Sequence, residues 1–299
     1  MPNGSIEKFF TDSVSNLDND TQNKLIEDLL KDKNLLKISD GEGSTVAHAL
    51  GRSGNETVQM DLIQYGNEIL KLVNKNGWSV AHEIGASSIA NVRVSLLEFA
   101  LMNDIKLLAL ADKNGLTVAH RLANGECSDR IGMEILQHKD ILKLRTNYGP
   151  AIEYNDMCVA DELAVWGGYG VLAALLDDKE ALRLASDDGF SVAHRLGNRL
   201  AGEFGSRIEI PDQLHNLQMK LLQDRELLKL ADKDGLTIAH ELAEGGDENI
   251  LIWLLKDKEL LKIADKEGKS VLDSLTQNWN SDTDKLKELL ENAKRESGV

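Results

Sequence analysis

The chain has 299 residues, a net charge of −16 and an isoelectric point near 4.9. This excess of acidic side chains argues against nucleic acid as a partner, because that binding depends on Lys and Arg contacts to phosphate, and against anionic membrane surfaces. No stretch approaches the roughly 18 consecutive apolar residues of a membrane-spanning helix.

Cysteine usage and the N-terminal residues bear on the compartment. The two cysteines, Cys127 and Cys158, cannot form a disulfide framework, which favours a reducing environment. Residues 1–17 show no basic region followed by an apolar run, as a secretory leader would. We therefore expect a cytoplasmic protein. A bacterial effector exported by a non-classical route would have the same composition.

Residues 1–40 precede the first complete sequence motif. Residues 6–10 (IEKFF) are predicted to be helical, and residues 21–38 match the second helix of later segments. Because the Gly, Thr and His signature of those segments is missing here, we predict that residues 1–40 form a cap, with the polar outer face that a terminal repeat needs.

From residue 40 onward one motif, typified by DKDGLTIAHELA at 232–243, occurs seven times. One copy is split between TNYG at 146–149 and CVADELA at 158–164. Self-similarity at a period of this size indicates a protein built from stacked repeats.

The aligned copies give columns with a physical meaning. Each copy opens with a turn-forming residue, and three positions later comes a glycine, which suits a backbone with φ > 0. These glycines are Gly43, Gly77, Gly115, Gly149, Gly189, Gly235 and Gly268. A Ser or Thr then predicts the N-cap of a short helix. Three positions beyond it stand His48, His82, His120, Asp161, His194, His240 and Asp273.

These columns resemble the ankyrin repeat, whose fingerprint is an Asp-x-x-Gly turn followed by T-P-L-H-x-A. The resemblance covers roughly residues 35–296, although no copy has the Pro and six copies have Ala before the His position. It implies an all-α, ankyrin-like helical repeat solenoid of about seven repeats plus an N-terminal capping helix pair. Longer amphipathic helices are predicted after each signature, at 55–72, 92–108, 128–144, 169–183, 214–230, 247–263 and 281–295.

The expected organisation is a single repeat domain spanning 1–299. Its parts are an N-terminal cap at 1–40, repeats at 41–73, 74–111, 112–145, 146–185, 186–231 and 232–264, and a C-terminal cap repeat at 265–299. Where the ankyrin family has Gly after the second helix, this chain has mostly Asp, as at Asp32, Asp104 and Asp257. Such an Asp predicts an N-cap for a further helical turn, and hence short, partly helical connections in place of long β-hairpins.

The spacing between successive His-column positions runs 34, 38, 41, 33, 46 and 33 residues. The longer spacings indicate insertions at 85–90, 150–156 and 199–213, and insertions in repeat arrays map to loops. Two interpretations stay open for these loops. They carry binding specificity, or they result from chance insertion at surface positions where added loop length destabilises the fold little.

The histidine column invites a metal hypothesis. Its members stand one per repeat, about 10 Å apart as packed helices are, whereas zinc needs ligands within about 2.3 Å. The resemblance implies a structural role instead, in which His48, His82, His120, His194 and His240 tie their repeats to neighbouring turns. Asp161 and Asp273 cannot donate a hydrogen bond when ionised, so those two junctions should differ. No catalytic residue, metal or cofactor is expected.

The resemblance also implies a function. Ankyrin proteins bind partners through the turn tips and the adjoining concave face of short helices, so the residues after the turn glycine become candidate contacts. The candidates are Trp78, Leu116, Phe190 and Leu236, together with Tyr154 and Phe204 from the insertions. Packing of each side chain on the next turn is the competing interpretation.

We therefore expect a non-catalytic, monomeric protein–protein interaction scaffold whose protein partner has a basic surface. The alternatives are a metal-dependent or enzymatic protein that uses the histidine ladder, and a self-assembling structural protein.

Overall fold

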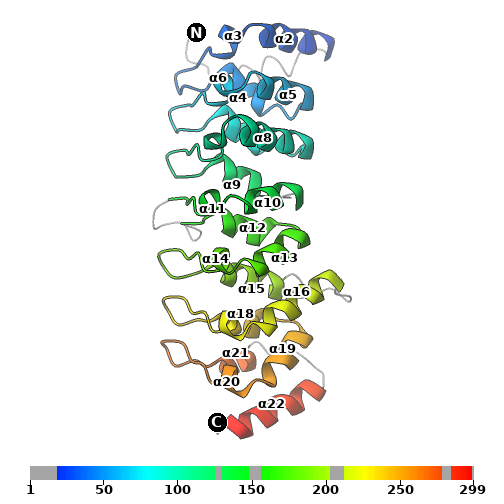
Figure 1. The fold of residues 1–299 in the computed structure, drawn as a ribbon, viewed down its shortest axis with the longest axis vertical. Helices are drawn as coiled ribbons and strands as arrows, with labels where there is room; N and C mark the ends of the chain where they lie inside the picture. Colours follow the sequence, from blue (N-terminus) through cyan, green and yellow to red (C-terminus); the bar gives the residue numbers. More distant parts are fainter. Residues whose placement is uncertain (1–18, 125–128, 148–155, 203–211, 278–283, 298–299) are drawn as a thin grey trace. The chain divides into compact units, whose positions relative to one another are not determined.

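A computed structural model describes residues 19–124, 129–147, 156–202, 212–277 and 284–297 (Figure 1). The chain divides into two compact units, unit 1 at residues 1–159 and unit 2 at residues 160–299. The described residues are largely helical, and their β-structure is confined to isolated bridges. The predicted all-α repeat fold is thereby confirmed, while the repeat boundaries given above stay a prediction.

Unit 1 contains three kinds of helix in a repeating order. The helices are α2 (Asn19–Lys31), α3 (Lys33–Leu36), α4 (Val46–Gly51), α5 (Glu56–Gln64), α6 (Asn67–Leu70), α7 (Val80–Gly85), α8 (Ala90–Asn103), η2 (Ile105–Leu107), α9 (Val118–Ala123), α10 (Asp129–Leu136) and α11 (Lys139–Leu142). Helix α12 (Val159–Trp166) begins at the last residue of unit 1.

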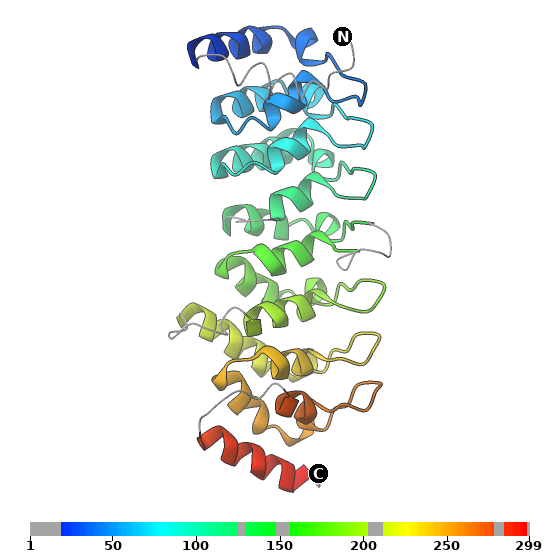
Figure 2. The ribbon, with the colours of Figure 1, turned by 180° about the vertical axis from the view of Figure 1, so that it is seen from behind.

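Unit 2 continues the same order. Its helices are α13 (Tyr169–Asp177), α14 (Lys179–Leu182), α15 (Val192–Gly202), α16 (Asp212–Gln223), α17 (Arg225–Leu228), α18 (Ile238–Gly245), α19 (Glu248–Leu255), α20 (Lys258–Leu261), α21 (Val271–Gln277) and α22 (Asp284–Ser297). Within each unit a repeat thus consists of a first helix, a second helix and a short third helix, and a turn then projects from the stack (Figure 2).

The single long helix predicted at 281–295 is confirmed by α22, whereas the six predicted between residues 55 and 263 are wrong, because each is divided into a second helix and a short third helix. An aspartate stands at most of these interruptions and caps the short helix that follows. Asp257, for example, accepts hydrogen bonds from the backbone N–H groups of Glu259 and Leu260 at the start of α20. An aspartate in an N-cap takes an extended backbone, which ends one helix and starts another. The predicted capped third turn is therefore present at these positions.

The first helices begin at a reciprocal capping arrangement. The Thr45 hydroxyl oxygen accepts from the backbone N–H of His48, and the His48 ring accepts from the backbone N–H of Thr45. This is a capping box in which His replaces the usual Glu or Gln. Ser79 with His82, and Thr117 with His120, repeat it.

Small residues let the first helices pack closely. The alanine that precedes the His position is fully buried in every copy that has it. In unit 1, α7 packs between α4 and α9, and in unit 2, α18 packs between α15 and α21. The second helices contribute the larger aliphatic side chains, such as Leu96 and Leu221, both 0% exposed. The core is therefore a continuous layer between first and second helices within each unit.

One of the three insertions matches the predicted loop, and another differs from it in part. Residues 86–89 form the predicted loop between α7, which ends at Gly85, and α8, which begins at Ala90. Ser87 in this loop is buried and donates a hydrogen bond to Gln59. Residues 199–202 and 212–213 extend α15 and α16. Residues 203–211 and 150–155 lie outside the described residues. The added length at 85–90 is therefore packed against the neighbouring repeat.

Candidate protein-binding surface

The turn tips are built by side chains that bond to their own backbone. In the tip at residues 232–235, the Asp232 carboxylate accepts from the backbone N–H groups of Asp234 and Leu236, both at 2.9 Å, and Gly235 has φ +86°. Asp40, Asn74, Asp112 and Asp265 make the same pair of bonds in their own tips. These bonds fix the tip conformation without any partner.

Neighbouring tips are joined through their backbones. In unit 1, the backbone N–H of Lys75 donates to the carbonyl of Glu42, and that of Lys113 donates to Asn76, both at 2.9 Å. In unit 2, Lys233 donates to Asp188 at 2.8 Å and Lys266 to Asp234 at 2.9 Å. Each unit therefore presents a row of tips in a fixed register.

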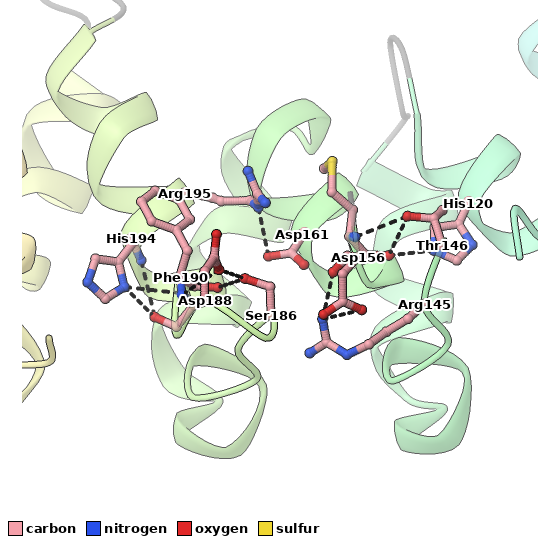
Figure 3. Close-up of polar contacts among 12 residues, drawn as sticks. His120, Arg145, Thr146, Asp156, Asp161, Ser186, Asp188, Phe190, His194 and Arg195 are labelled. Atoms are coloured by element: carbon pink, nitrogen blue, oxygen red, sulfur yellow. Dashed lines mark hydrogen bonds and ion pairs between the residues drawn. The ribbon is translucent and has the colours of Figure 1, made fainter. Parts of the chain in front are cut away.

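The split copy closes its turn by a different route. Thr146 and Met157 form a backbone pair on either side of residues 148–155, and the Thr146 hydroxyl accepts from the Met157 N–H at 3.0 Å (Figure 3). Asp156 has φ +64° and stands two residues before Cys158, the spacing that the turn glycine has in the compact copies. By its spacing and its positive φ, Asp156 therefore stands in the position of that glycine. Gly149, the predicted turn glycine of this copy, lies outside the described residues. Aspartate tolerates this left-handed conformation better than most residues.

Each signature histidine joins its repeat to the next one. The Nε2 atoms of the histidines lie 2.9–3.2 Å from the carbonyl oxygen that precedes the next helix cap. In unit 1 the acceptors are Trp78, Leu116 and Met157, and in unit 2 they are Leu236 and Lys269. All five imidazoles are fully buried.

The bonding partners determine the charge of these rings. A backbone N–H donates to Nδ1, so that atom must carry a lone pair, and a carbonyl faces Nε2, so that atom must carry the proton. The rings are therefore neutral. Burial lowers the pKa of all five below the ordinary value, most strongly for His120, whose pKa falls to about 4. Both nitrogens are occupied within the chain, which leaves neither available to a metal.

The two aspartates in the histidine column make different junctions, as expected. Asp161 is 1% exposed and pairs with Arg195 of the next repeat, with 3.0 Å between its Oδ1 and Arg195 Nε (Figure 3). Asp273 instead accepts from the N–H and the hydroxyl of Ser270 at the start of α21, and these bonds lower its pKa. An ion pair thus replaces the His-to-carbonyl bond at the first of these positions.

Two of the predicted contact residues, Trp78 and Phe190, have the same surroundings in different units. The Trp78 ring stacks on His82 with 5.1 Å between centroids, and the Arg121 guanidinium lies over the Trp78 ring, 4.3 Å from its centroid. Phe190 lies 5.0 Å from His194 and 5.1 Å from the Arg195 guanidinium. Both aromatic residues are half-buried, so part of each remains exposed to solvent.

The remaining predicted contacts lie in different environments. Leu236 is half-buried beside its tip, whereas Leu116 is only 7% exposed and belongs to the core. Tyr154 and Phe204 lie outside the described residues. Trp78, Phe190 and Leu236 are therefore the described candidates that reach the surface.

Charged residues follow the His position on the first helices, and this surface is called the short-helix face below. In unit 1, Glu83 pairs with Arg52 at 3.2 Å. In unit 2, Glu241 is partly buried close to Glu244, and burial raises its pKa to about 7, with Glu244 adding to the shift. Glu244 in turn pairs with Lys269 at 2.7 Å. Sequence reasoning missed these residues, although all of them lie within four positions of a signature histidine or a helix cap.

The chemistry of the remaining candidates is limited. Cys158 is a buried cysteine next to the N-terminus of α12, and Cys127 lies outside the described ranges. Among residues that the structure describes, no group of three His, Cys, Asp or Glu side chains is arranged to hold a metal ion. Within the same ranges, no helix has the length and apolar character needed to cross a bilayer.

Comparison with known proteins supports the fold. No protein-family model and no curated protein matches the sequence. Among solved structures, the ankyrin repeat domain of Bcl-3, a member of the IκB protein family, matches with a TM-score of 0.52 and 15% identity, over 84% of this chain and 99% of that one. A chain from the complex of a Bdellovibrio bacteriovorus predatory endopeptidase with an immunity protein matches with a TM-score of 0.46 and 20% identity, over 71% of this chain and 96% of that one.

The repeat geometry and the likeness to the Bcl-3 domain together define the fold class. The chain has an ankyrin-like repeat fold of the all-α class. At 15% identity the likeness concerns the fold alone, and function has to be argued from the surface.

Proposed function

We propose that this protein is a non-catalytic scaffold that binds a protein partner through its turn tips and short-helix face. The observation that carries the proposal is the pairing of a half-buried aromatic ring with an arginine at Trp78 and at Phe190. Aromatic and arginine side chains are the residues that most often dominate protein–protein binding energy.

The charge of the tips supports a partner with a basic surface. The third tip residue is acidic at Glu42, Asp188, Asp234 and Glu267, and the whole chain has a net charge of −16. Complementary charge accelerates association and selects against wrongly charged partners. The protein acts as a monomer in this proposal, in the cytoplasm, and light scattering over a range of concentrations would expose a self-assembling protein.

The enzymatic or metal-dependent alternative conflicts with the histidine geometry. A metal ion on His120 would displace either the Thr117 N–H from Nδ1 or the Met157 carbonyl from Nε2. The ring is also fully buried, so a substrate has no access to it without local unfolding.

The test is capture of partners from cytosolic extract with two matched charge variants. Asp234→Lys/Glu267→Lys reverses two tip charges, whereas Glu134→Lys/Glu226→Lys reverses two charges on helices away from the tips. A specific partner should be retained by the wild type and by the second variant, and lost from the tip variant. Phe190→Ala should also reduce its capture, while Met102→Ala, at a side chain 80% exposed on α8, should not.

Two outcomes contradict the proposal. If both charge variants lose the partner equally, binding depends on the overall charge of the protein and not on the turn tips. Absence of any partner, together with metal that remains bound after dialysis, would favour the metal-dependent alternative.

A further inference from the structure

One cation on the short-helix face of unit 1, Arg121, differs in its pairing from the charges at the same position of other repeats. Arg121 follows His120 on α9 and is half-buried, and its guanidinium lies over the Trp78 ring. In the part of the chain that the structure describes, Arg121 makes no ion pair, and its Nε atom is buried without a hydrogen-bond partner. An arginine in this state is unexpected in a chain with 50 acidic and 34 basic residues.

Other repeats hold a paired charge at the position after the histidine column. Glu83 lies 3.2 Å from the Nε atom of Arg52, the C-cap residue of α4 in the preceding repeat. In unit 2, Arg195 lies 3.0 Å from Asp161, which holds the histidine-column position of the preceding repeat (Figure 3). In both cases, therefore, a residue of the preceding repeat supplies the counter-charge.

The repeat that precedes Arg121 has no carboxylate at either of the two corresponding positions. Ala86 is the C-cap of α7, as Arg52 is of α4, and its side chain carries no charge. His82 holds the histidine-column position, and its ring is neutral and bonded to the Leu116 carbonyl. Burial, with the charge of Arg121 adding to it, lowers the pKa of His82 and keeps the ring neutral. The guanidinium is therefore left without compensation from these positions.

The Arg121 side chain is held in place along its length. Its stem lies against Gly85 of α7, where an added Cβ would come within 3.2 Å of the Arg121 Cβ. Its guanidinium lies over Trp78, whose ring in turn stacks on His82. A guanidinium on an aromatic face keeps its fork of N–H donors, which matches the two oxygens of a carboxylate. Because a side chain fixed in advance loses little entropy on binding, Arg121 is prepared to receive an anion.

We propose that Arg121, held over Trp78, binds a carboxylate side chain of the protein partner at the short-helix face of unit 1. This contact depends on the scaffold function proposed above and adds one chemical group that the partner has to present. A carboxylate is favoured because Arg195, at the same position beside Phe190, is paired with one. A single guanidinium also balances one negative charge, whereas a phosphoryl group carries about two.

The tips and Arg121 then select the partner by charges of opposite sign. Acidic tip residues such as Glu42 face basic groups of the partner, and Arg121 faces an Asp or Glu among them. This mixed pattern fixes the register of the interface, because a shifted or uniformly basic partner would bring like charges together.

The test uses NMR spectra of the isotope-labelled full-length chain at constant ionic strength. The probe is glutamate blocked at both its amino and its α-carboxyl group, so that the side-chain carboxylate is its only charge. The Trp78 indole N–H and the Arg121 Nε–H report on the site, since burial of Nε slows exchange of its proton with water. Both signals should shift and saturate with the glutamate probe and not with the matching glutamine probe. The Trp78→Phe variant identifies the indole signal.

Three variants separate the site from the overall charge. Arg121→Gln should raise the Kd of the glutamate probe at the Trp78 signal by about fivefold or more, because charged hydrogen bonds are lost. Arg121→Lys keeps the charge but not the fork and should weaken binding less. The matched control Arg130→Gln removes the same charge from an exposed side chain on α10 and should change the Kd less than about twofold. If circular dichroism shows that Arg121→Gln does not fold, Arg121→Lys decides between the outcomes.

The proposal is overturned if the signals do not saturate with the glutamate probe, if the glutamine probe acts equally, or if Arg121→Gln binds as tightly as the wild type. Inorganic phosphate that binds at the same signals more tightly than the glutamate probe would show that carboxylate is the wrong choice. A partner captured equally by the wild type and by Arg121→Glu would contradict this contact and leave the scaffold function standing. Binding of the probe without any captured partner would contradict the scaffold function and leave the carboxylate site.

Discussion

The buried histidines act as neutral donors, each to a single backbone carbonyl of the following repeat. At the same time, Nδ1 accepts a hydrogen bond from the backbone N–H of the helix N-cap. One histidine side chain thus caps its own helix and binds the turn of the next repeat. A substitution removes both contacts and leaves buried backbone groups without a partner.

His240→Ala should lower the free energy of unfolding by about 1–2 kcal/mol, since the Lys269 carbonyl and the Thr237 N–H both lose their bonding partner. Urea unfolding followed by circular dichroism measures the change. Partner capture should persist at a temperature where the variant is folded. A change near zero, or lost capture without lost stability, would contradict the structural role.

Lowering the pH should destabilise the protein at pH values well above those at which ordinary carboxyl groups titrate. The folded-state pKa of each signature histidine lies below the ordinary 6.5, so the unfolded chain binds more protons as the pH falls below about 6.5, and stability drops. For His120, whose folded pKa is about 4, the loss approaches about 3 kcal/mol at pH 4.

Glu241 acts in the opposite direction and requires a control. Its folded pKa of about 7 lies above the ordinary 4.5, so its contribution to stability is present at low pH and is lost as the pH rises towards 7. Urea midpoints of the Glu241→Gln variant between pH 7.5 and 5 isolate the histidines. A flat profile in this variant would show that the rings accept protons without loss of the fold.

At the scale of the element, much of the pattern could be predicted from single residues. The turn glycines, the Ser or Thr caps and the Asp caps of the third helices act through their own backbone or that of near neighbours, so their effects are visible in a sequence window of a few residues. The break of the long helices at Gly66 and at His138 is less visible, because neither residue makes a side-chain cap bond.

Contacts between repeats were harder to predict. The Asp161–Arg195 pair, the Arg121 guanidinium over Trp78 and the burial of Leu116 all depend on how one repeat lies on the next. The sequence does place an arginine after His120 and after His194, but nothing in either local window indicates what that side chain contacts.

Substitutions at two turn glycines can distinguish the effect of backbone conformation on stability from the effect of packing between neighbouring tips. Gly235 and Gly268 have nearly equal φ, +86° and +85°, yet a Cβ on Gly235 would lie 2.9 Å from the Lys266 backbone nitrogen, and one on Gly268 would meet nothing within 4 Å. Gly268→Ala should therefore lower stability by about 1 kcal/mol through strain alone, and Gly235→Ala by distinctly more. If urea unfolding shows the same loss of stability for both variants, neighbouring tips can move apart to accommodate the added methyl group.

At the scale of the whole molecule, charge opposes compactness. A net charge of −16 produces repulsion among exposed acids that paired lysines reduce only in part. Most of the ion pairs between repeats are partly exposed, and such pairs contribute little each.

Added salt should consequently stabilise the protein. Raising NaCl from low ionic strength to roughly 0.3 M shortens the screening length and should raise the Tm by a few degrees in a differential scanning fluorimetry series. The Asp234→Lys/Glu267→Lys variant, whose net charge is smaller, should show a smaller rise. A Tm that falls with salt would mean that the ion pairs outweigh the repulsion.

The acceptor of each histidine is a main-chain carbonyl, and this has a consequence for how the array can evolve. The residues that supply the carbonyl are as different as Trp78, Leu116, Met157, Leu236 and Lys269. Because the bond makes no demand on the side chain, natural variation at the half-buried positions among them, such as Trp78 and Leu236, can alter the surface while the hydrogen bond between repeats is kept. Duplicated copies would keep the same coupling while their recognition positions diverge, so a lineage can acquire new specificities from a constant framework.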